Sequence, residues 1–330
     1  MSLGRREALR LAALAGAAGL APGLIPWAAT AQGTYPSQPI RLLVPNGAGG
    51  VADLTARTVG QAMSDRLGQP VVVENRPGAG GIVAGQALMT APADGYTLMV
   101  ATNAHAISPS LFRTLPFDPL RDFAPVGLMG SFAIALLVSP KSPVQTVQDL
   151  LAKLKQDPNA NIGTISVGST QNLAAELFKT ATGIETVTVP FSSTPELLTA
   201  LLRGDVTVAF EIVAPLMGQI RGGSLRAIAV TSAERAANLP DVPTLQQQGL
   251  KDFDVTSWNA LVAPGKTPQP VIDKLNTAMN AALAESEVRK KLLDAGVEAR
   301  GGTPAAMSQL LRTETAKWRD VIEKAGIEKQ

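Results

Sequence analysis

The amino-acid sequence predicts an α/β protein with two lobes. Short apolar runs of strand length alternate with longer stretches of helical spacing, and this alternation is typical of a parallel sheet with helices on both faces. The alternation occurs twice, once before about residue 135 and once after it. About 300 residues remain after an N-terminal export segment is set aside, which fits two domains of ordinary size.

The strand and helix boundaries follow from apolar spacing and from turn residues. The first strand ends at Pro45, and the first helix keeps its apolar spacing until Gly68 and Pro70 interrupt it. The predicted strands are residues 40–44, 71–73, 96–101, a pair within 123–138, 187–190, 206–210 and 225–231. The predicted helices are residues 51–67, 81–90, 146–155, 173–182, 195–203, 270–285, 287–295 and 304–325.

The N-terminal segment has the features of an export signal. Arg5 and Arg6 open a twin-arginine pattern, an apolar run follows over residues 11–25, and Ala29-Thr30-Ala31 forms a cleavage site. A membrane anchor needs about 20 strongly apolar residues, and this run is shorter and interrupted by proline. We therefore expect a cleaved signal peptide at residues 1–31 and a periplasmic mature chain. The general secretory route is the alternative to the twin-arginine route.

Composition excludes several classes of function. Removing the signal takes three arginines and one glutamate from 29 basic and 27 acidic residues, so 26 of each remain. A nucleic-acid partner would need a basic stripe, and none is expected. The chain has no cysteine and one histidine, which leaves too few groups for a usual zinc site or catalytic triad. We expect a monomer with no catalysis, no metal and no cofactor.

The loop after the first strand is the candidate anion site. Gly47, Gly49 and Gly50 would let the backbone approach a ligand closely. The helix that follows directs its free N–H groups and the positive end of its dipole toward the loop. This arrangement would bind a carboxylate without a charged side chain.

The same loop also fits a dinucleotide-binding pattern. Gly47, Gly49 and Ala52 match G-x-G-x-x-[GA], and Glu74 follows about 20 residues later. An exported dinucleotide-binding oxidoreductase is therefore an alternative function. Residues 45–46 argue against it, because they lengthen the turn before the first glycine.

Six sequence segments carry a family resemblance that covers residues 35–327. In chain order they are YPSQPIRLLVP, GGVADLTAR, LGQPVVVENRPGAGG, APADGYTLMVATNAHAISPSLF, LRAIAVTSAERAANLPDVPTL and SWNALVAPGKTP. Together they resemble the extracytoplasmic substrate-binding proteins of tripartite tricarboxylate transporters, the TctC-like or Bug family. The stretches VVVENRPGAGG and DGYTL are the most specific.

The resemblance implies a type II periplasmic-binding-protein fold, or Venus flytrap, with two interlobe crossings near residues 131–138 and 256–261. Lobe 1 would comprise residues 34–135 and 257–330, and lobe 2 residues 136–256. A small organic carboxylate would bind in the cleft and pass to the membrane permease subunits of the transporter. A ligand sensor for a signalling partner would share this fold and remains an alternative.

The family's cleft loops also supply a set of candidate ligand-binding residues. Lobe 1 contributes Asn46, Gly47, Ala48, Gly49, Asp53, Thr102, Asn103 and His105. Lobe 2 contributes Ser166, Gly168, Ser169, Thr170, Gln171, Phe191, Ser192, Thr194 and Glu211. Trp258 lies at the second crossing.

Several of these residues have an equally plain structural role. Asp53 fits the first turn of a helix, where the dipole favours a carboxylate. Ser169 and Thr170 could simply cap a helix. His105 could be a hydrogen-bonded structural group, and Trp258 could pack at the hinge.

The charges of the candidate cleft limit the ligand. The loops contain no Lys or Arg, Ser192 stands where the family usually has lysine, and Glu211 would add a negative charge. Because an unpaired buried charge is costly, we expect a monocarboxylate whose far end is neutral, a hydrogen-bond donor or an amine. Citrate should not bind.

Overall fold

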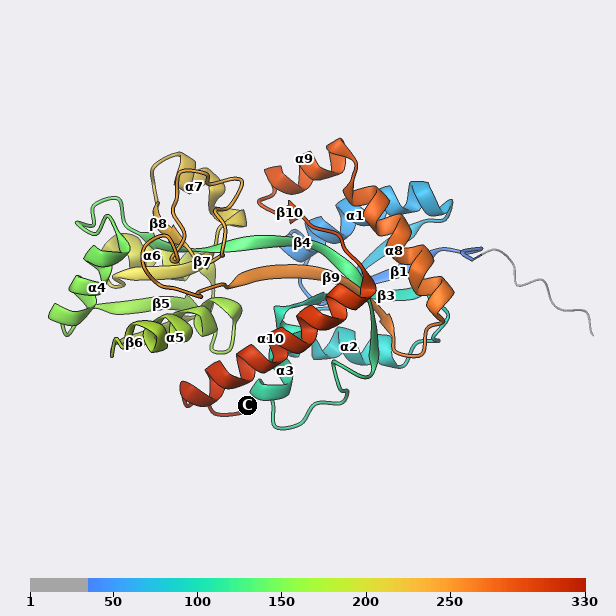
Figure 1. Ribbon diagram of the computed structural model, residues 1–330, viewed down its shortest axis with the longest axis horizontal. Helices are drawn as coiled ribbons and strands as arrows, with labels where there is room; N and C mark the ends of the chain where they lie inside the picture. Colours follow the sequence, from blue (N-terminus) through green and yellow to red (C-terminus); the bar gives the residue numbers. More distant parts are fainter. Residues whose placement is uncertain (1–34) are drawn as a thin grey trace, which may run out of the picture. The chain divides into compact units, whose positions relative to one another are not determined.

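The computed structural model describes residues 35–330 (Figure 1). The predicted signal peptide, residues 1–31, lies outside this part of the chain. Among the described residues, no helix has both the length and the apolar character that a membrane span requires.

In the described residues, ten strands form one mixed sheet. They are β1 (Ile40–Val44), β2 (Val71–Asn75), β3 (Thr97–Thr102), β4 (Phe123–Val138), β5 (Asn161–Ile165), β6 (Val187–Phe191), β7 (Val208–Ile212), β8 (Arg226–Val230), β9 (Thr256–Pro264) and β10 (Glu298–Ala299). The strand order is β2-β1-β3-β9-β4-β7-β5-β6, and both β8 and β10 pair with β4.

Ten α-helices accompany the sheet in the described part of the chain. They are α1 (Val51–Leu67), α2 (Ile82–Met89), α3 (Asn103–Leu111), α4 (Val147–Gln156), α5 (Thr170–Thr182), α6 (Thr194–Arg203), α7 (Met217–Arg221), α8 (Gln269–Leu283), α9 (Ser286–Asp294) and α10 (Pro304–Lys324). Short 3₁₀ turns occur at Ala79–Gly81 and Ala214–Leu216.

The sheet is parallel only in part. β1 pairs in parallel with β2 and β3, and β5 pairs in parallel with β6 and β7, as the alternation of strands and helices predicts. β4 and β9 instead run antiparallel to their neighbours. The expectation of an entirely parallel sheet is therefore wrong, because these two strands connect two groups rather than belonging to a strand–helix–strand unit.

β4 is a single strand of 16 residues, where the sequence predicted a pair. Its first part, Phe123–Ala133, pairs with β9, and its last part, Ile134–Val138, pairs with β7 and β8. Figure 1 shows β4 and β9 running side by side from one group of strands to the other. The two crossings predicted near residues 131–138 and 256–261 fall on these strands. The assignment of residues to lobe 1 and lobe 2 stays a prediction, and we use both names in that sense.

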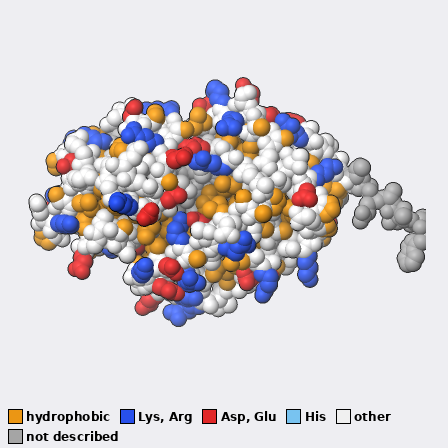
Figure 2. Space-filling view, viewed as in Figure 1, with side chains coloured by type: hydrophobic (Ala, Val, Ile, Leu, Met, Phe, Trp, Pro, Cys, Tyr) orange, Lys and Arg blue, Asp and Glu red, His pale blue; other side chains and the backbone are white. Residues whose placement is uncertain are grey.

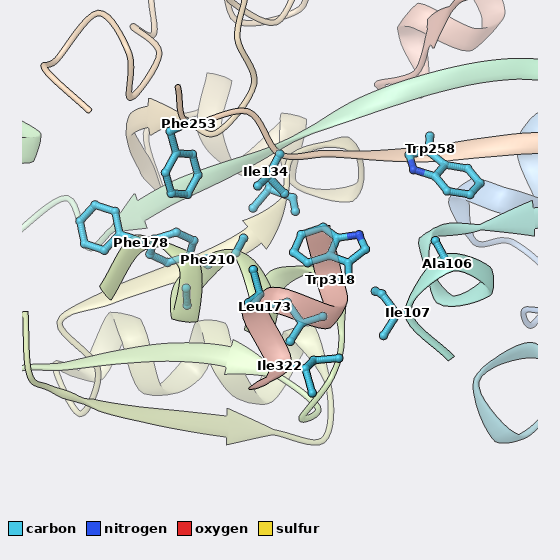
Figure 3. Packing of buried hydrophobic residues seen from close by; sticks show 14 of the residues in the cluster. Ala106, Ile107, Ile134, Leu173, Phe178, Phe210, Phe253, Trp258, Trp318 and Ile322 are labelled. Atoms are coloured by element: carbon cyan, nitrogen blue, oxygen red, sulfur yellow. The ribbon is translucent and has the colours of Figure 1, made fainter. Parts of the chain in front are cut away.

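A hydrophobic core extends under both groups of strands. Trp258 of β9 and Trp318 of α10 are almost wholly buried. Figure 3 shows Trp318 lying toward Leu173 of α5 and Ile107 of α3. Since α10 contacts α3, β4 and α5, this helix packs against residues of both predicted lobes.

Five strands and helices were not predicted from the sequence. α3 contains Pro109, Asn103 and two serines, which are poor helix formers. β5, α7, β9 and β10 were also missed. β5 and α7 are only five residues long and β10 only two, and β9 was recognised only as a crossing. α3 matters for function, because its first turn reaches the candidate site.

Candidate functional site

A cavity of about 300 Å³ lies where the two groups of strands meet. We call it the central pocket. From lobe 1 it is lined by Asn46, Gly50, Val51, Ala52, Thr102, Asn103, Ala104 and Ile107; from lobe 2 by Ile165, Gly168, Ser169, Thr170, Gln171 and Ile212; and from the crossing strands by Phe132, Ser257, Trp258 and Asn259. None of these lining residues is charged.

Three helices begin at the central pocket. The residues before α1 and α3, Gly50 and Thr102, make no side-chain cap, so the first-turn N–H groups stay free of side-chain acceptors. Ser169 caps α5 by accepting from the N–H of Asn172 at 3.1 Å. Helix N-termini carry a partial positive charge and favour anions. Two such ends come from lobe 1 and one from lobe 2, so the pocket can hold a carboxylate without a cationic side chain.

Asp53 stabilises the loop between β1 and α1 through hydrogen bonds. Its carboxylate accepts hydrogen bonds from the Gly49 N–H at 2.9 Å, from Arg57 at 3.0 Å and from Asn75 Nδ2 at 2.9 Å. Asn75 also donates to the Asn46 carbonyl at 3.0 Å. Burial raises the pKa of the Asp53 carboxyl, but these hydrogen bonds outweigh burial and hold the pKa below its usual value. Asp53 does not line the pocket, and the geometry therefore favours its structural role.

Glu211 lies behind the lobe 2 wall. Its carboxylate accepts from Gln171 Nε2 at 2.7 Å, from Thr194 Oγ1 at 2.9 Å and from the Ile212 N–H at 2.7 Å. Burial raises the pKa of Glu211, and the three hydrogen bonds offset only part of this effect. The pocket itself is lined by Gln171 and Ile212. The expectation that Glu211 places a charge in the cleft needs correction, because its partners cover the carboxylate.

Asn103 and Trp258 join the pocket to the crossing strand. Asn103 Nδ2 donates to the Thr256 carbonyl at 3.0 Å, and its Oδ1 accepts from the Trp258 N–H at 2.9 Å. Glu314 of α10 accepts from Trp318 Nε1 at 2.9 Å and lies 3.4 Å from Asn103 Nδ2. Trp258 therefore both lines the pocket and packs in the core.

His105 lies in an aromatic cluster outside the pocket lining. Its ring meets Phe123 edge-to-face at 4.7 Å between centroids and stacks on Phe117 at 6.0 Å. Burial lowers the pKa of His105 to about 4, and a hydrogen bond with the Pro119 backbone offsets this only partly. The imidazole is thus neutral at neutral pH, and its surroundings are those of a core residue.

Gly168 provides a close contact between the two predicted lobes. Its φ angle is +79°, and a Cβ at this position would lie 2.5 Å from a methyl carbon of Leu111, at the end of α3. The Gly168 N–H donates to Asn172 Oδ1 at 3.0 Å. Only glycine satisfies both the backbone angle and this approach.

Eight of the eighteen candidate residues line the central pocket, and ten do not. The lining ones are Asn46, Thr102, Asn103, Gly168, Ser169, Thr170, Gln171 and Trp258. The others are Gly47, Ala48, Gly49, Asp53, His105, Ser166, Phe191, Ser192, Thr194 and Glu211. Several of these stabilise nearby loops: Ser166 N–H donates to the Phe191 carbonyl at 2.9 Å, and Ser192 Oγ to Glu196 at 2.6 Å.

Sequence reasoning missed some lining residues. Ser257 and Asn259 flank Trp258, so the predicted crossing was the signal that could have found them. Phe132 belongs to the other crossing, and Ile107 belongs to the unpredicted helix α3. Ala52 was considered only as part of a dinucleotide pattern.

The geometry around Glu74 differs from what a dinucleotide site needs. Its carboxylate is paired with Arg41 at 2.7 Å and with Arg76 at 2.6 Å, and hydrogen bonds from both arginines lower its pKa. The carboxylate that a dinucleotide site would use to bind a ribose hydroxyl is therefore committed to structural ion pairs.

Comparisons with known proteins agree with the fold. A model of the tripartite tricarboxylate transporter family receptor matches residues 55–327. The protein BugT of Bordetella pertussis is 33% identical over 296 residues, which span 89% of this chain and 91% of BugT.

Two solved structures from Rhodopseudomonas palustris are also similar. Rpa4515 with adipate has a TM-score of 0.79 and 34% identity, covering 90% of this chain and all of that one. MatC with bound malate has a TM-score of 0.74 and 32% identity, covering 87% of this chain and all of that one.

These matches decide between a solute receptor and an enzyme, two of the functions left open by the sequence. They confirm the two-lobed periplasmic-binding-protein fold, and the family and its solved members are solute-binding receptors rather than enzymes. The dinucleotide-binding oxidoreductase is thereby excluded. The chain belongs to the receptor family of the tripartite tricarboxylate transporters, the TctC or Bug family of solute-binding proteins.

Proposed function

We propose that this protein is a periplasmic receptor that binds a small organic carboxylate in the central pocket and delivers it to the membrane subunits of a tripartite transporter. The proposal extends the family assignment in three respects: the ligand class, the location and the membrane partner.

The convergence of three helix N-termini on a pocket without charged side chains carries the proposal. A carboxylate placed there would meet backbone N–H groups and three positive dipole ends, each worth about 0.3–1 kcal/mol and more when partly buried. The apolar side chains of Ile107, Ile165, Ile212 and Phe132 would enclose its carbon skeleton. The relatives solved with adipate and with malate support a carboxylate ligand.

The periplasmic location of the protein is supported by its sequence, and delivery of the ligand to a transporter is supported by its family. The twin-arginine pattern and the cleavage site at Ala29-Thr30-Ala31 support export. The name of the family supports a transporter as the partner.

A thermal-shift screen of carboxylic acids, followed by calorimetry, tests the ligand class. A ligand at about 100 times its Kd should stabilise the protein by about 2.7 kcal/mol. Neutral analogues in which an amide replaces the only carboxylate should give no shift. If these neutral analogues bind as well as the acids, the proposed anion site is wrong.

A further inference from the structure

The side-chain amides of the central pocket differ in which atom they leave available to a ligand. An amide has an NH₂ donor at one end and a carbonyl acceptor at the other. Hydrogen bonds made outside the pocket therefore determine which end a ligand can meet. Gln171, Asn259 and Asn103 line the pocket, and each has partners that fix its orientation.

Gln171 is oriented by Glu211. Its Nε2 donates to Glu211 Oε1 at 2.7 Å, and the same oxygen accepts from the Ile212 N–H at 2.7 Å. Because Glu211 Oε1 already accepts from a backbone N–H, it acts as an acceptor, so the amide must turn its NH₂ group toward it. Among residues 35–330, the Gln171 side chain is hydrogen-bonded through Nε2, to Glu211, and its Oε1 is left for a ligand. The lobe 2 wall therefore presents an acceptor.

Asn259 is oriented by Thr55 in the same manner. The Thr55 hydroxyl donates to the Val51 carbonyl at 2.7 Å, so it can offer only lone pairs to Asn259 Nδ2, which lies at 3.0 Å. Asn259 is fully buried, and its Oδ1 has no donor in the described part of the chain. A buried acceptor without a partner costs about 1–3 kcal/mol, and a ligand donor would remove that cost.

Asn103 provides the contrast. Both ends of its amide are used, with Nδ2 on the Thr256 carbonyl and Oδ1 on the Trp258 N–H. Asn103 can therefore position α3 but offers no free acceptor. The pocket walls thus combine backbone donors at three helix ends with an amide acceptor on Gln171 and a buried, unpartnered acceptor on Asn259.

We infer that the ligand is a monocarboxylate that also carries a hydrogen-bond donor, which is an amino or hydroxyl group. Gln171 Oε1 and Asn259 Oδ1 would accept hydrogen bonds from this group. The inference rests on the proposed function, since it assigns the remainder of the molecule whose carboxylate lies at the helix ends. A second carboxylate near these oxygens would face two acceptors, with Glu211 behind them. Burying such an unpaired charge is costly, so a plain dicarboxylate should bind poorly.

Calorimetry with acids of one chain length tests the inference on the exported, mature protein. The panel is hexanoate, adipate, and six-carbon monocarboxylates with a hydroxyl or an amino group at C2 or C6. At least one donor-bearing acid should bind ten times more tightly than both hexanoate and adipate. The four donor-bearing acids cover both ends of the chain, so the position of the donor need not be known beforehand.

Variants identify the acceptor. Gln171→Met keeps the length of the side chain and removes its acceptor, so the preference for the donor-bearing acid over hexanoate should fall at least fivefold. Asn259→Asp keeps an acceptor and should retain more of the preference than Asn259→Leu. Gln309→Met, on an exposed position of α10, is the matched control and should change nothing.

Two results would overturn the inference while leaving the receptor function intact: adipate binding at least as tightly as every donor-bearing acid, or an unchanged preference in Gln171→Met. If Gln171→Met does not fold, the ranking of ligands on the wild-type protein decides. Failure of all carboxylates to bind would instead contradict the proposed function itself.

Discussion

Gly168 combines a positive φ angle with a close contact between the two predicted lobes. Gly183 also has a positive φ, +64°, but a Cβ there would meet nothing within 4 Å. We expect both Gly168→Ala and Gly183→Ala to lose about 1 kcal/mol of stability from backbone strain. Only Gly168→Ala should also weaken carboxylate binding, by about tenfold, because its Cβ would push Leu111 away.

Calorimetry on the two alanine variants, with urea unfolding for stability, separates the effects. Equal affinity in both variants would show that the contact between Gly168 and Leu111 plays no part in binding.

The buried ring of His105 makes the stability of the folded protein depend on pH. The pKa of its buried ring is about 4 in the folded protein, below the ordinary value of 6.5, so the unfolded chain takes up a proton first as the pH falls. Stability should therefore fall between about pH 6.5 and pH 4, by about 2 kcal/mol from pH 7 to pH 5.

His105→Phe should remove this loss, because it is the only histidine in the chain. Urea unfolding at pH 7 and pH 5 measures the difference for each protein, so a constant packing change in the variant cancels. The same loss in wild type and variant would assign the pH dependence to other groups.

At the scale of elements, the loop between β1 and α1 depends on Asp53. Its carboxylate bridges the Gly49 N–H, Arg57 and Asn75, and Asn75 in turn binds the Asn46 carbonyl at the edge of the pocket. Asp53→Ala removes the charge and the acceptor of all three donors. We expect a loss of about 1–3 kcal/mol of stability, because hydrogen bonds to a charged group are lost while the Arg57 side chain is half exposed.

The same change should weaken carboxylate binding by at least tenfold, since the loop would lose its fixed path at the start of α1. Asp65→Ala, at the exposed C-terminal end of α1, serves as the control and should have little effect on either quantity. A ligand affinity that survives Asp53→Ala would show that the loop needs no support from this carboxylate.

For the whole molecule, the placement of the pocket predicts a hinge. Its walls come from both predicted lobes, and β4 and β9 are the strands that connect them.

The interspersed positive and negative side chains on the face in Figure 2 give no sign of a basic nucleic-acid surface.

Ligand binding should therefore close the lobes. Small-angle scattering should give a smaller radius of gyration with ligand, and the fluorescence of Trp258 should change because this residue lines the pocket. An unchanged radius at saturating ligand, with binding confirmed by calorimetry, would contradict a closing mechanism.

Local patterns in the sequence determined much of this molecule. The strand–helix alternation predicted the α/β fold, Gly68 and Pro70 marked the end of α1, and the ordered motifs identified the family. The family resemblance placed the glycine-rich loop and the first residues of α5 at one cleft, and Asn46, Gly50, Ser169 and Thr170 from these segments line the central pocket.

Only the tertiary structure decided what each candidate side chain contacts. Asp53 and Glu211 carry carboxylates of the kind that ligand sites often use. In the structure, however, the Asp53 carboxylate is hydrogen-bonded to Arg57 and Asn75, and the Glu211 carboxylate to Gln171 and Thr194. The free acceptors lie instead on Gln171 and on Asn259, whose partner Thr55 is 204 residues away in the chain. The physical reason is that the orientation of a side-chain amide depends on hydrogen bonds between segments distant in sequence. Local sequence patterns do not predict these hydrogen bonds.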